Sequence, residues 1–230
     1  MKIAGLQKLT LLDYPEHTAC TVFTAGCNFR CPFCHNSDVV YNKTEGVREE
    51  EFFEFLASRK GKLDGVCITG GEPLLQPDLI EFMQKIRKLG FLIKLDTNGS
   101  LHDKLVAIVN EGLCDYVAMD VKSNPNGYNI ACGGMVNVDN VLKSIAFLIG
   151  QNKIDYEFRT TVVKELHSKQ DFEEIASLLK GCKRYFLQQY KHSHKVIKEG
   201  YSAYSEVEMK ELCEIVKGFG INCALRGIDG

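Results

Sequence analysis

The sequence lacks the features that would point to a membrane or to secretion. No apolar run within its 230 residues is long enough to cross a bilayer. The first residues, Met1 to Gly5, lack the apolar core and the small-residue cleavage site of a signal peptide. We therefore expect a cytoplasmic protein that has no membrane partner.

A surplus of charge of one sign is missing as well. Lys and Arg together number 28, Asp and Glu together number 30, and the formal net charge is -2 at pH 7. A protein that contacts a long stretch of phosphate backbone needs a basic field. Nucleic acid is therefore not an expected partner.

Proline-rich linkers, internal repeats and low-complexity segments are also absent. A chain of this length with 45% hydrophobic residues can bury one core, so we expect a single domain over residues 1–230. The ten cysteines would suggest disulfides in a small secreted protein. In a reducing compartment they are metal ligands, reactive thiols or core residues, and their spacing has to decide.

Short apolar runs alternate with segments of helical period from about Thr18 onward. The predicted strands are Thr18–Thr24, Gly65–Thr69, Phe91–Asp96, Tyr116–Val121, Asp155–Val163, Arg184–Gln188 and Asn222–Arg226. The predicted helices are Glu49–Arg59, Pro77–Leu89, Leu101–Glu111, Val138–Ile149, Gln170–Leu179 and Ser205–Phe219. This order predicts an α/β protein whose parallel sheet closes into a barrel or stays open as a doubly wound layer. Both architectures bind ligands beyond the carboxyl ends of the strands.

Three thiols lie within eight residues, at Cys27, Cys31 and Cys34, after the first predicted strand. Four thiolates complete an ordinary 4Fe-4S cluster, so three without an obvious fourth would leave one iron open to another ligand. The alternative is a structural zinc site that adds His35 or a distant cysteine to the trio. The other seven cysteines have no ligand spacing, and most of them are expected in the core.

The spacing C-x3-C-x2-C, with Phe33 before the last cysteine, resembles the signature of the radical S-adenosylmethionine (SAM) superfamily. The resemblance implies a partial (β/α)6 TIM-like barrel, open on one side, that holds a 4Fe-4S cluster and SAM. In that family, SAM chelates the open iron, and reduction of the cluster releases methionine and a 5'-deoxyadenosyl radical. The resemblance also implies that Phe33 packs on the adenine and that Asn36 belongs to the cofactor site; the alternative for Phe33 is a core aromatic.

Gly70, Gly71 and Glu72 follow the second predicted strand. Two glycines let the backbone approach a ligand closely, and a carboxylate can accept hydrogen bonds from an ammonium group. The segment resembles the GGEP motif of the superfamily, which binds the amino group of SAM. A plain strand-to-helix turn is the alternative.

Polar groups also end the next two predicted strands. Asp96, Thr97 and Asn98 could contact a ribose or cap the following helix. Asp120 and Lys122 alternate by two along a strand end, where they could hold a zwitterion or form a surface ion pair.

Both stretches resemble segments of the glycyl-radical-enzyme activating enzymes. That resemblance implies a monovalent cation site at Asp96, Thr97 and Asp120, and a contact between Lys122 and SAM. It also implies that Arg159, a charged residue within a predicted strand, lies near SAM; the alternative is an arginine at a sheet edge. His192 and His194 receive no role.

Nearly the whole chain resembles the anaerobic ribonucleoside-triphosphate reductase activating proteins. The most specific parts are Leu12–Pro15 and Gly26–Asn36. The resemblance implies an oxidoreductase that abstracts hydrogen from a backbone glycine of a partner enzyme and leaves a glycyl radical. It also implies a flavodoxin- or ferredoxin-type electron donor.

Three other functions stay open from the sequence. The chain could activate another glycyl radical enzyme. It could act on a small molecule, as enzymes similar to 7-carboxy-7-deazaguanine synthase do. It could also be a non-catalytic protein with a structural zinc or electron-transfer site.

Overall fold

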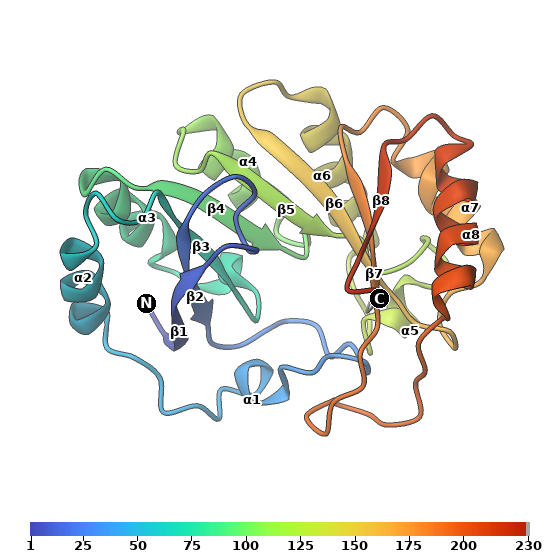
Figure 1. The fold of residues 1–230 in the computed structure, drawn as a ribbon, viewed down its shortest axis with the longest axis horizontal. Helices are drawn as coiled ribbons and strands as arrows, with labels where there is room; N and C mark the ends of the chain where they lie inside the picture. The colour runs from blue at the N-terminus through green and yellow to red at the C-terminus, as the bar shows by residue number, and fades with distance from the viewer. Residues whose placement is uncertain (229–230) are drawn as a thin grey trace.

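The computed structural model describes residues 1–228, which form one curved eight-stranded sheet wrapped on its outside by helices (Figure 1). The strands are β1 (Ile3–Thr10), β2 (Ala19–Thr24), β3 (Gly65–Gly70), β4 (Leu92–Thr97), β5 (Tyr116–Asp120), β6 (Asp155–Val162), β7 (Tyr185–Gln189) and β8 (Cys223–Arg226). They lie side by side in sequence order, and β2 to β8 are all parallel. Within residues 1–228, the edge strands β1 and β8 do not pair with each other, so the barrel is open along one side.

Helices connect the parallel strands as the hydrophobic periodicity predicts. The long ones are α2 (Glu49–Ser58), α3 (Leu79–Lys88), α4 (His102–Asn110), α6 (Val138–Gly150), α7 (Lys169–Leu178) and α8 (Glu206–Lys217). Ser168 and Ser205 begin α7 and α8 with complete capping boxes, which satisfy the first free backbone N–H groups. The predicted partial (β/α)6 barrel is confirmed: six βα units run from β2 to α8, and β8 closes the series.

Predicted boundaries agree with the structure to within one or two residues, but four elements were missed. Three of them are helices of one turn, α1 (Ser37–Val40), the 3-10 helix η1 (Pro73–Leu75) and α5 (Tyr128–Ala131), which are too short to show a period. The fourth is β1, which runs antiparallel to β2 at the sheet edge. Only its end residues Ile3 and Thr10 are buried, so it carries no regular alternation.

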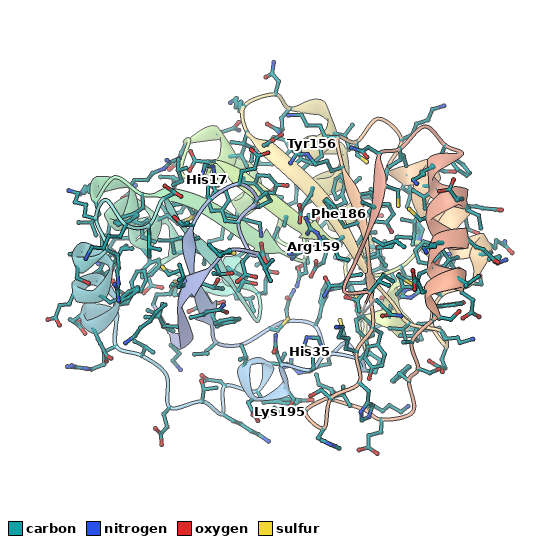
Figure 2. The ribbon with its side chains drawn as sticks, viewed as in Figure 1. His17, His35, Tyr156, Arg159, Phe186 and Lys195 are labelled. Atoms are coloured by element: carbon teal, nitrogen blue, oxygen red, sulfur yellow. The ribbon has the colours of Figure 1, made fainter. Side chains whose placement is uncertain are left out.

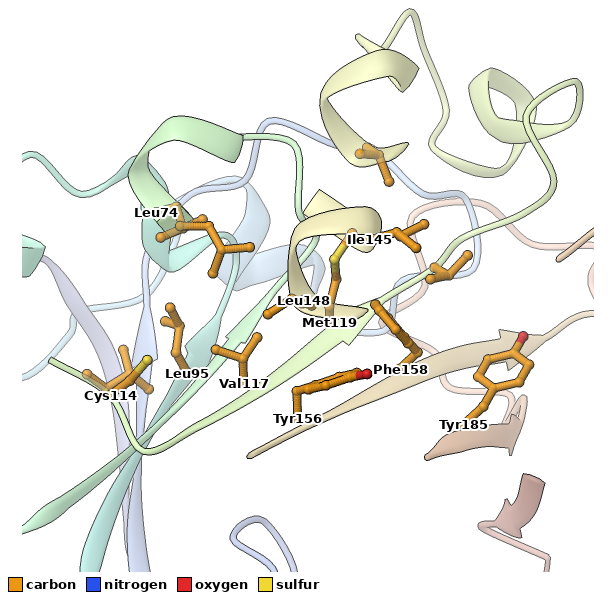
Figure 3. Close-up of a cluster of buried hydrophobic side chains, with 14 of the residues drawn as sticks. Leu74, Leu95, Cys114, Val117, Met119, Ile145, Leu148, Tyr156, Phe158 and Tyr185 are labelled. Atoms are coloured by element: carbon orange, nitrogen blue, oxygen red, sulfur yellow. The ribbon is translucent and has the colours of Figure 1, made fainter. Parts of the chain in front are cut away.

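The core fills the space between the sheet and its helices. Side chains of β5 and β6 pack against α6, as Figure 3 shows for Val117, Met119 and Phe158 near Leu148. The seven cysteines outside the trio are all buried, as predicted. Within residues 1–228, no helix combines the length and the apolar character that crossing a membrane requires.

Candidate functional site

A pocket of about 380 Å³ lies at the carboxyl ends of the parallel strands. Its volume is within the usual range for ligand pockets, about 300–1,000 Å³. All but one of the residues predicted from the sequence line it: Cys27, Cys31, Phe33, Cys34, Asn36, Gly70, Gly71, Asp96, Thr97, Asn98, Asp120, Lys122 and Arg159. The exception is Glu72. Parallel strands therefore bring together motifs that are more than 100 residues apart in the sequence.

The loop that carries the cysteine trio, residues 25–36, is tied to distant segments by its backbone. Arg30 N–H donates to the carbonyl of Cys132 over 2.8 Å. A Cβ at Gly133 would lie 2.1 Å from the Arg30 carbonyl oxygen, and Gly133 has a φ of +70°, so only glycine fits there. These contacts fix the direction in which the loop presents its thiols.

The three thiols differ in their surroundings. Cys31 is buried, while Cys27 and Cys34 are half-buried on the pocket wall. Burial raises the pKa of Cys27 to about 12 and also raises the pKa of Cys34. A hydrogen bond from the Cys132 thiol lowers the pKa of Cys31. Because the thiolate is the metal ligand, metal binding at Cys27 and Cys34 has to release protons.

This donor set fits a 4Fe-4S cluster better than it fits zinc. Among residues 1–228, no three Cys, His, Asp or Glu side chains converge on one point, as the ligands of a single zinc ion must. A four-iron cluster makes a different demand, because each thiolate binds its own iron at one corner of the cluster. Three thiols on one loop that face one pocket would hold three irons and leave the fourth open to a ligand in that pocket.

Glu72 lies behind the pocket wall and joins two of the motifs. Its carboxylate is fully buried and accepts hydrogen bonds from the hydroxyl of Thr97 over 2.8 Å and from the N–H groups of Leu74 and Asn98 over 3.1 and 2.7 Å. Burial raises the pKa of Glu72 to about 7, although these hydrogen bonds favour the charged form. The side chain therefore holds the end of β4 against the end of β3.

Gly71 explains why the segment after β3 needs glycine. A Cβ at this position would lie 1.8 Å from the carbonyl oxygen of Gly26, and the N–H of Glu72 donates to that same oxygen over 2.9 Å. The backbone of this segment thus packs directly on the start of the cysteine loop. The turn after β3 therefore supports the cysteine loop as well as connecting the strand to the next helix.

A network of charged side chains, Asp96, Asp120, Lys122 and Arg159, lines another part of the pocket wall. Arg159 donates to Asp120 over 3.0 Å and to Asp96 over 3.2 Å, and Lys122 donates to Asp120 over 2.8 Å. Burial alone would raise the pKa of each carboxyl group, but the neighbouring cations outweigh it and hold both below their usual range. Both carboxylates are therefore charged at neutral pH.

The structure excludes three of the alternatives that the sequence left open. Asp120 and Lys122 do pair, but they line the pocket and do not form a plain surface pair. Arg159 stands on β6, between β5 and β7, so it is not at a sheet edge. The helix after β4 has Leu101 as its N-cap and no side-chain cap, so the capping role for the preceding polar residues is wrong.

Phe33 is a core aromatic that also lines the pocket, and its contact with adenine stays a prediction. It is 5% exposed and packs within the hydrophobic core. Figure 2 shows Arg159 in the middle of the molecule, with His35 of the cysteine loop below it. His192 and His194 do not line the pocket.

Sequence reasoning missed several residues that support the site. Lys94 is 2% exposed and pairs with Asp96, and the signal was a lysine inside the apolar run of β4. Asp13 lines the pocket and accepts from Thr21 over 2.5 Å. His167 is buried, with its Nε2 2.8 Å from the carbonyl oxygen of Lys122, and no local pattern marked it.

A second pocket of about 210 Å³ adjoins the first and shares Asp13, Arg159 and Gln188 with it. Its other walls include Leu12 and Pro15, from the loop between β1 and β2, and Arg226 and Gly227 at the end of β8. The second pocket therefore spans the open side of the barrel.

Comparisons with known proteins agree with this geometry. The family model of the radical SAM superfamily matches residues 21–185. A Methanocaldococcus jannaschii protein named as a glycyl-radical enzyme activating enzyme is 32% identical over 99% of this chain and 97% of its own length. The pyruvate formate-lyase-activating enzyme of Clostridium pasteurianum is 29% identical over 79% of this chain and 77% of its own length.

Among solved structures, a radical SAM methyltransferase from Sphaerobacter thermophilus superposes with a TM-score of 0.74 and covers 95% of this chain and 68% of its own. At 18% identity this likeness concerns the fold alone. The family model and the full-length relative carry the assignment. The chain belongs to the radical SAM superfamily and, within it, to the glycyl-radical enzyme activating enzymes.

Proposed function

We propose that this enzyme activates an anaerobic ribonucleotide reductase by abstracting a hydrogen atom from a backbone glycine of that partner. The observation that carries the proposal is that one pocket contains both the three cysteine thiols and a half-buried network of charged side chains. When the cluster and SAM are bound, reduction of the cluster cleaves a carbon-sulfur bond of SAM and supplies the adenosyl radical that takes the hydrogen.

The residues of the chain divide the binding work between them. Cys27, Cys31 and Cys34 would hold three irons through thiolates. Gly70 and Gly71 line the pocket with backbone rather than side chains, which lets the amino group of SAM approach closely. Hydrogen-atom abstraction needs no catalytic base, so the remaining side chains orient SAM and the partner glycine and exclude water.

The charge of the network decides which ligand group it attracts. Lys94, Lys122 and Arg159 pair with Asp96 and Asp120, and Asp13 lines the same pocket as a third acidic side chain. Lys122 acts electrostatically on all three cysteine thiols, so it is the cation that would pair with the carboxylate of SAM. A monovalent cation would bind at the side-chain oxygens of Asp96, Thr97 and Asp120.

The open side of the barrel supports a polypeptide partner. The second pocket connects that side to the SAM pocket through shared residues. Leu12 lines the second pocket and is 91% exposed, and its sequence neighbours Leu9 and Leu11 are 58% and 69% exposed, which provides exposed apolar surface for a protein partner. The choice of the reductase as the target rests on the resemblance of Leu12–Pro15 and Gly26–Asn36 to its activating proteins.

The test is electron paramagnetic resonance on anaerobically reconstituted enzyme. We expect a reduced 4Fe-4S signal that changes when SAM is added, and a glycyl doublet when the reductase is also present. A doublet with pyruvate formate-lyase but none with the reductase would reassign the target. No doublet with any glycyl radical enzyme would reject the activating function.

A further inference from the structure

The segment that follows β7, residues 191–198, packs on the outer side of the cysteine loop. Ile197 N–H donates to the carbonyl of Cys34 over 3.1 Å, and Lys198 N–H donates to the carbonyl of Pro32 over 2.9 Å. In Figure 1 this segment runs along the lower edge of the molecule beside α1. The backbone of this segment is thus hydrogen-bonded directly to Cys34, whose thiol is a predicted cluster ligand.

This segment, which we name the basic segment, presents one sign of charge to solvent. Its sequence is Lys-His-Ser-His-Lys-Val-Ile-Lys, and its three lysines and two histidines are all exposed. It contains no acidic residue, although the whole chain carries a net charge of -2. Val196 and Ile197 are its half-buried apolar residues. Apolar side chains anchor the segment, and basic ones cover its outside.

Neighbouring side chains extend the basic surface. Arg30 of the cysteine loop and Lys43 lie 5.2 and 5.5 Å from the ring centre of the exposed Tyr41. Two acidic groups interrupt the surface: Asp38, 3.4 Å from Lys195, and the exposed Glu199, which follows Lys198 in the chain. Figure 2 shows Lys195 at the lower edge of the molecule, below His35.

We propose that the basic segment is the docking surface for an acidic one-electron carrier protein that reduces the cluster. This inference rests on the proposed function, because an enzyme of this kind has to receive an electron at its cluster in each cycle. In that step the reduced carrier loses one electron and the cluster passes from the 2+ to the 1+ state. No bond breaks and no proton moves.

The position of the basic segment favours an electron carrier over the glycyl radical partner. None of residues 191–198 lines the SAM pocket, so a polypeptide bound on them does not bring a glycine to SAM. An electron has only to reach Cys34, and the hydrogen bond from Ile197 provides a short path to it. Opposite charges on the two proteins would steer the encounter and raise its rate about 10- to 1,000-fold at low salt.

The test compares charge reversals on two faces. The variant Lys195→Glu/Lys198→Glu changes the basic segment. The control Lys60→Glu/Lys62→Glu makes the same change at two exposed lysines between α2 and β3, at the amino ends of the parallel strands, whereas the basic segment follows the carboxyl end of β7. Stopped-flow absorbance follows reduction of the cluster by an acidic flavodoxin hydroquinone at about 0.01 M and about 1 M salt, where charges are screened over about 30 and 3 Å.

We expect reduction of the unmodified enzyme to slow at least about tenfold from low to high salt. The basic-segment variant should be slower than the unmodified enzyme by about tenfold at low salt and equal to it at high salt. The control should behave as the unmodified enzyme does. Reduction by methyl viologen radical cation, which a basic surface does not attract, should not slow in either variant.

Binding provides a measure that does not depend on turnover. Isothermal titration of oxidised flavodoxin into each protein should give a Kd about tenfold weaker for the basic-segment variant only. The neutral variant Lys195→Gln/Lys198→Gln should fall between the two, which guards against a reversal that disturbs folding.

Three outcomes overturn the docking surface: unchanged flavodoxin kinetics in the basic-segment variant, an equal loss in the control, or a loss only in activation of the glycyl radical partner. Failure of the unmodified, viologen-reduced enzyme to cleave SAM would instead reject the proposed function. The two failures are therefore distinguishable.

Discussion

The fully buried carboxyl group of Glu72 makes a prediction about stability and pH. Its pKa is about 7 in the folded protein against 4.5 in an unperturbed chain. Between these values the folded state keeps a proton that the unfolded state has lost, so the free energy of unfolding falls as pH rises. At about 1.4 kcal/mol per pH unit, the loss amounts to about 3 kcal/mol between about pH 5 and about pH 8.

Replacing Glu72 with glutamine removes this titration. The amide NH2 would face one of the backbone N–H groups that now donate to the carboxylate, and a buried unpaired donor costs about 1–3 kcal/mol at any pH. The variant should therefore be the less stable protein at about pH 5. As pH rises toward 8, the parent loses its own 3 kcal/mol, and the difference should shrink or reverse.

Urea unfolding followed by circular dichroism at several pH values measures both profiles. The exposed Glu54→Gln change on α2 is the matched control and should keep the parent slope. If the Glu72→Gln protein and the parent lose stability in parallel between about pH 5 and about pH 8, the buried carboxyl does not titrate as argued.

Three further substitutions test the site. Cys34→Ala should abolish the SAM-dependent change in the 4Fe-4S resonance signal, whereas the buried Cys213→Ala should keep it; equal spectra from the two would reject the ligand assignment. Arg159→Met removes the guanidinium shared by the buried Asp96 and the half-buried Asp120, each of which keeps one lysine partner, so it should lower the free energy of unfolding by about 1.5–3 kcal/mol and weaken SAM binding in calorimetry; a loss under about 1 kcal/mol would contradict the network. Gly71→Ala places a methyl group 1.8 Å from the Gly26 carbonyl oxygen, so it should cost about 1–3 kcal/mol and lower the iron content after reconstitution, and parent values for both would refute the close approach.

Hydrophobic periodicity was enough to predict the parallel sheet and its long helices. Each strand from β2 onward is a short apolar run between helical segments, and this local signal is strong. Because parallel strands end at one edge, the same pattern predicts that Asp96, Asp120 and Arg159 lie near the cysteine trio. The structure confirms this convergence on one pocket.

Long-range contacts explain what the sequence could not show. The edge strand β1 owes its conformation to pairing with β2, and its own residues alternate poorly. Glu72 is the motif residue from which a SAM contact is expected. The direction of its carboxylate, however, depends on an N–H group that follows a different strand. His167 and Cys132 have no local signal for the site, since the site residues that they contact, Lys122 and Arg30, lie 45 and 102 residues away in the sequence.

The backbone ties of the cysteine loop have a consequence for the order in which the enzyme matures. The loop itself is made early, yet its supports at Cys132 and Ile197 are synthesised about 100 and about 160 residues later. Until that late segment has left the ribosome, the three thiols lack the scaffold that points them into the pocket. We therefore expect iron to be retained only by a nearly finished chain, and a truncation before Ile197 should retain no cluster after reconstitution.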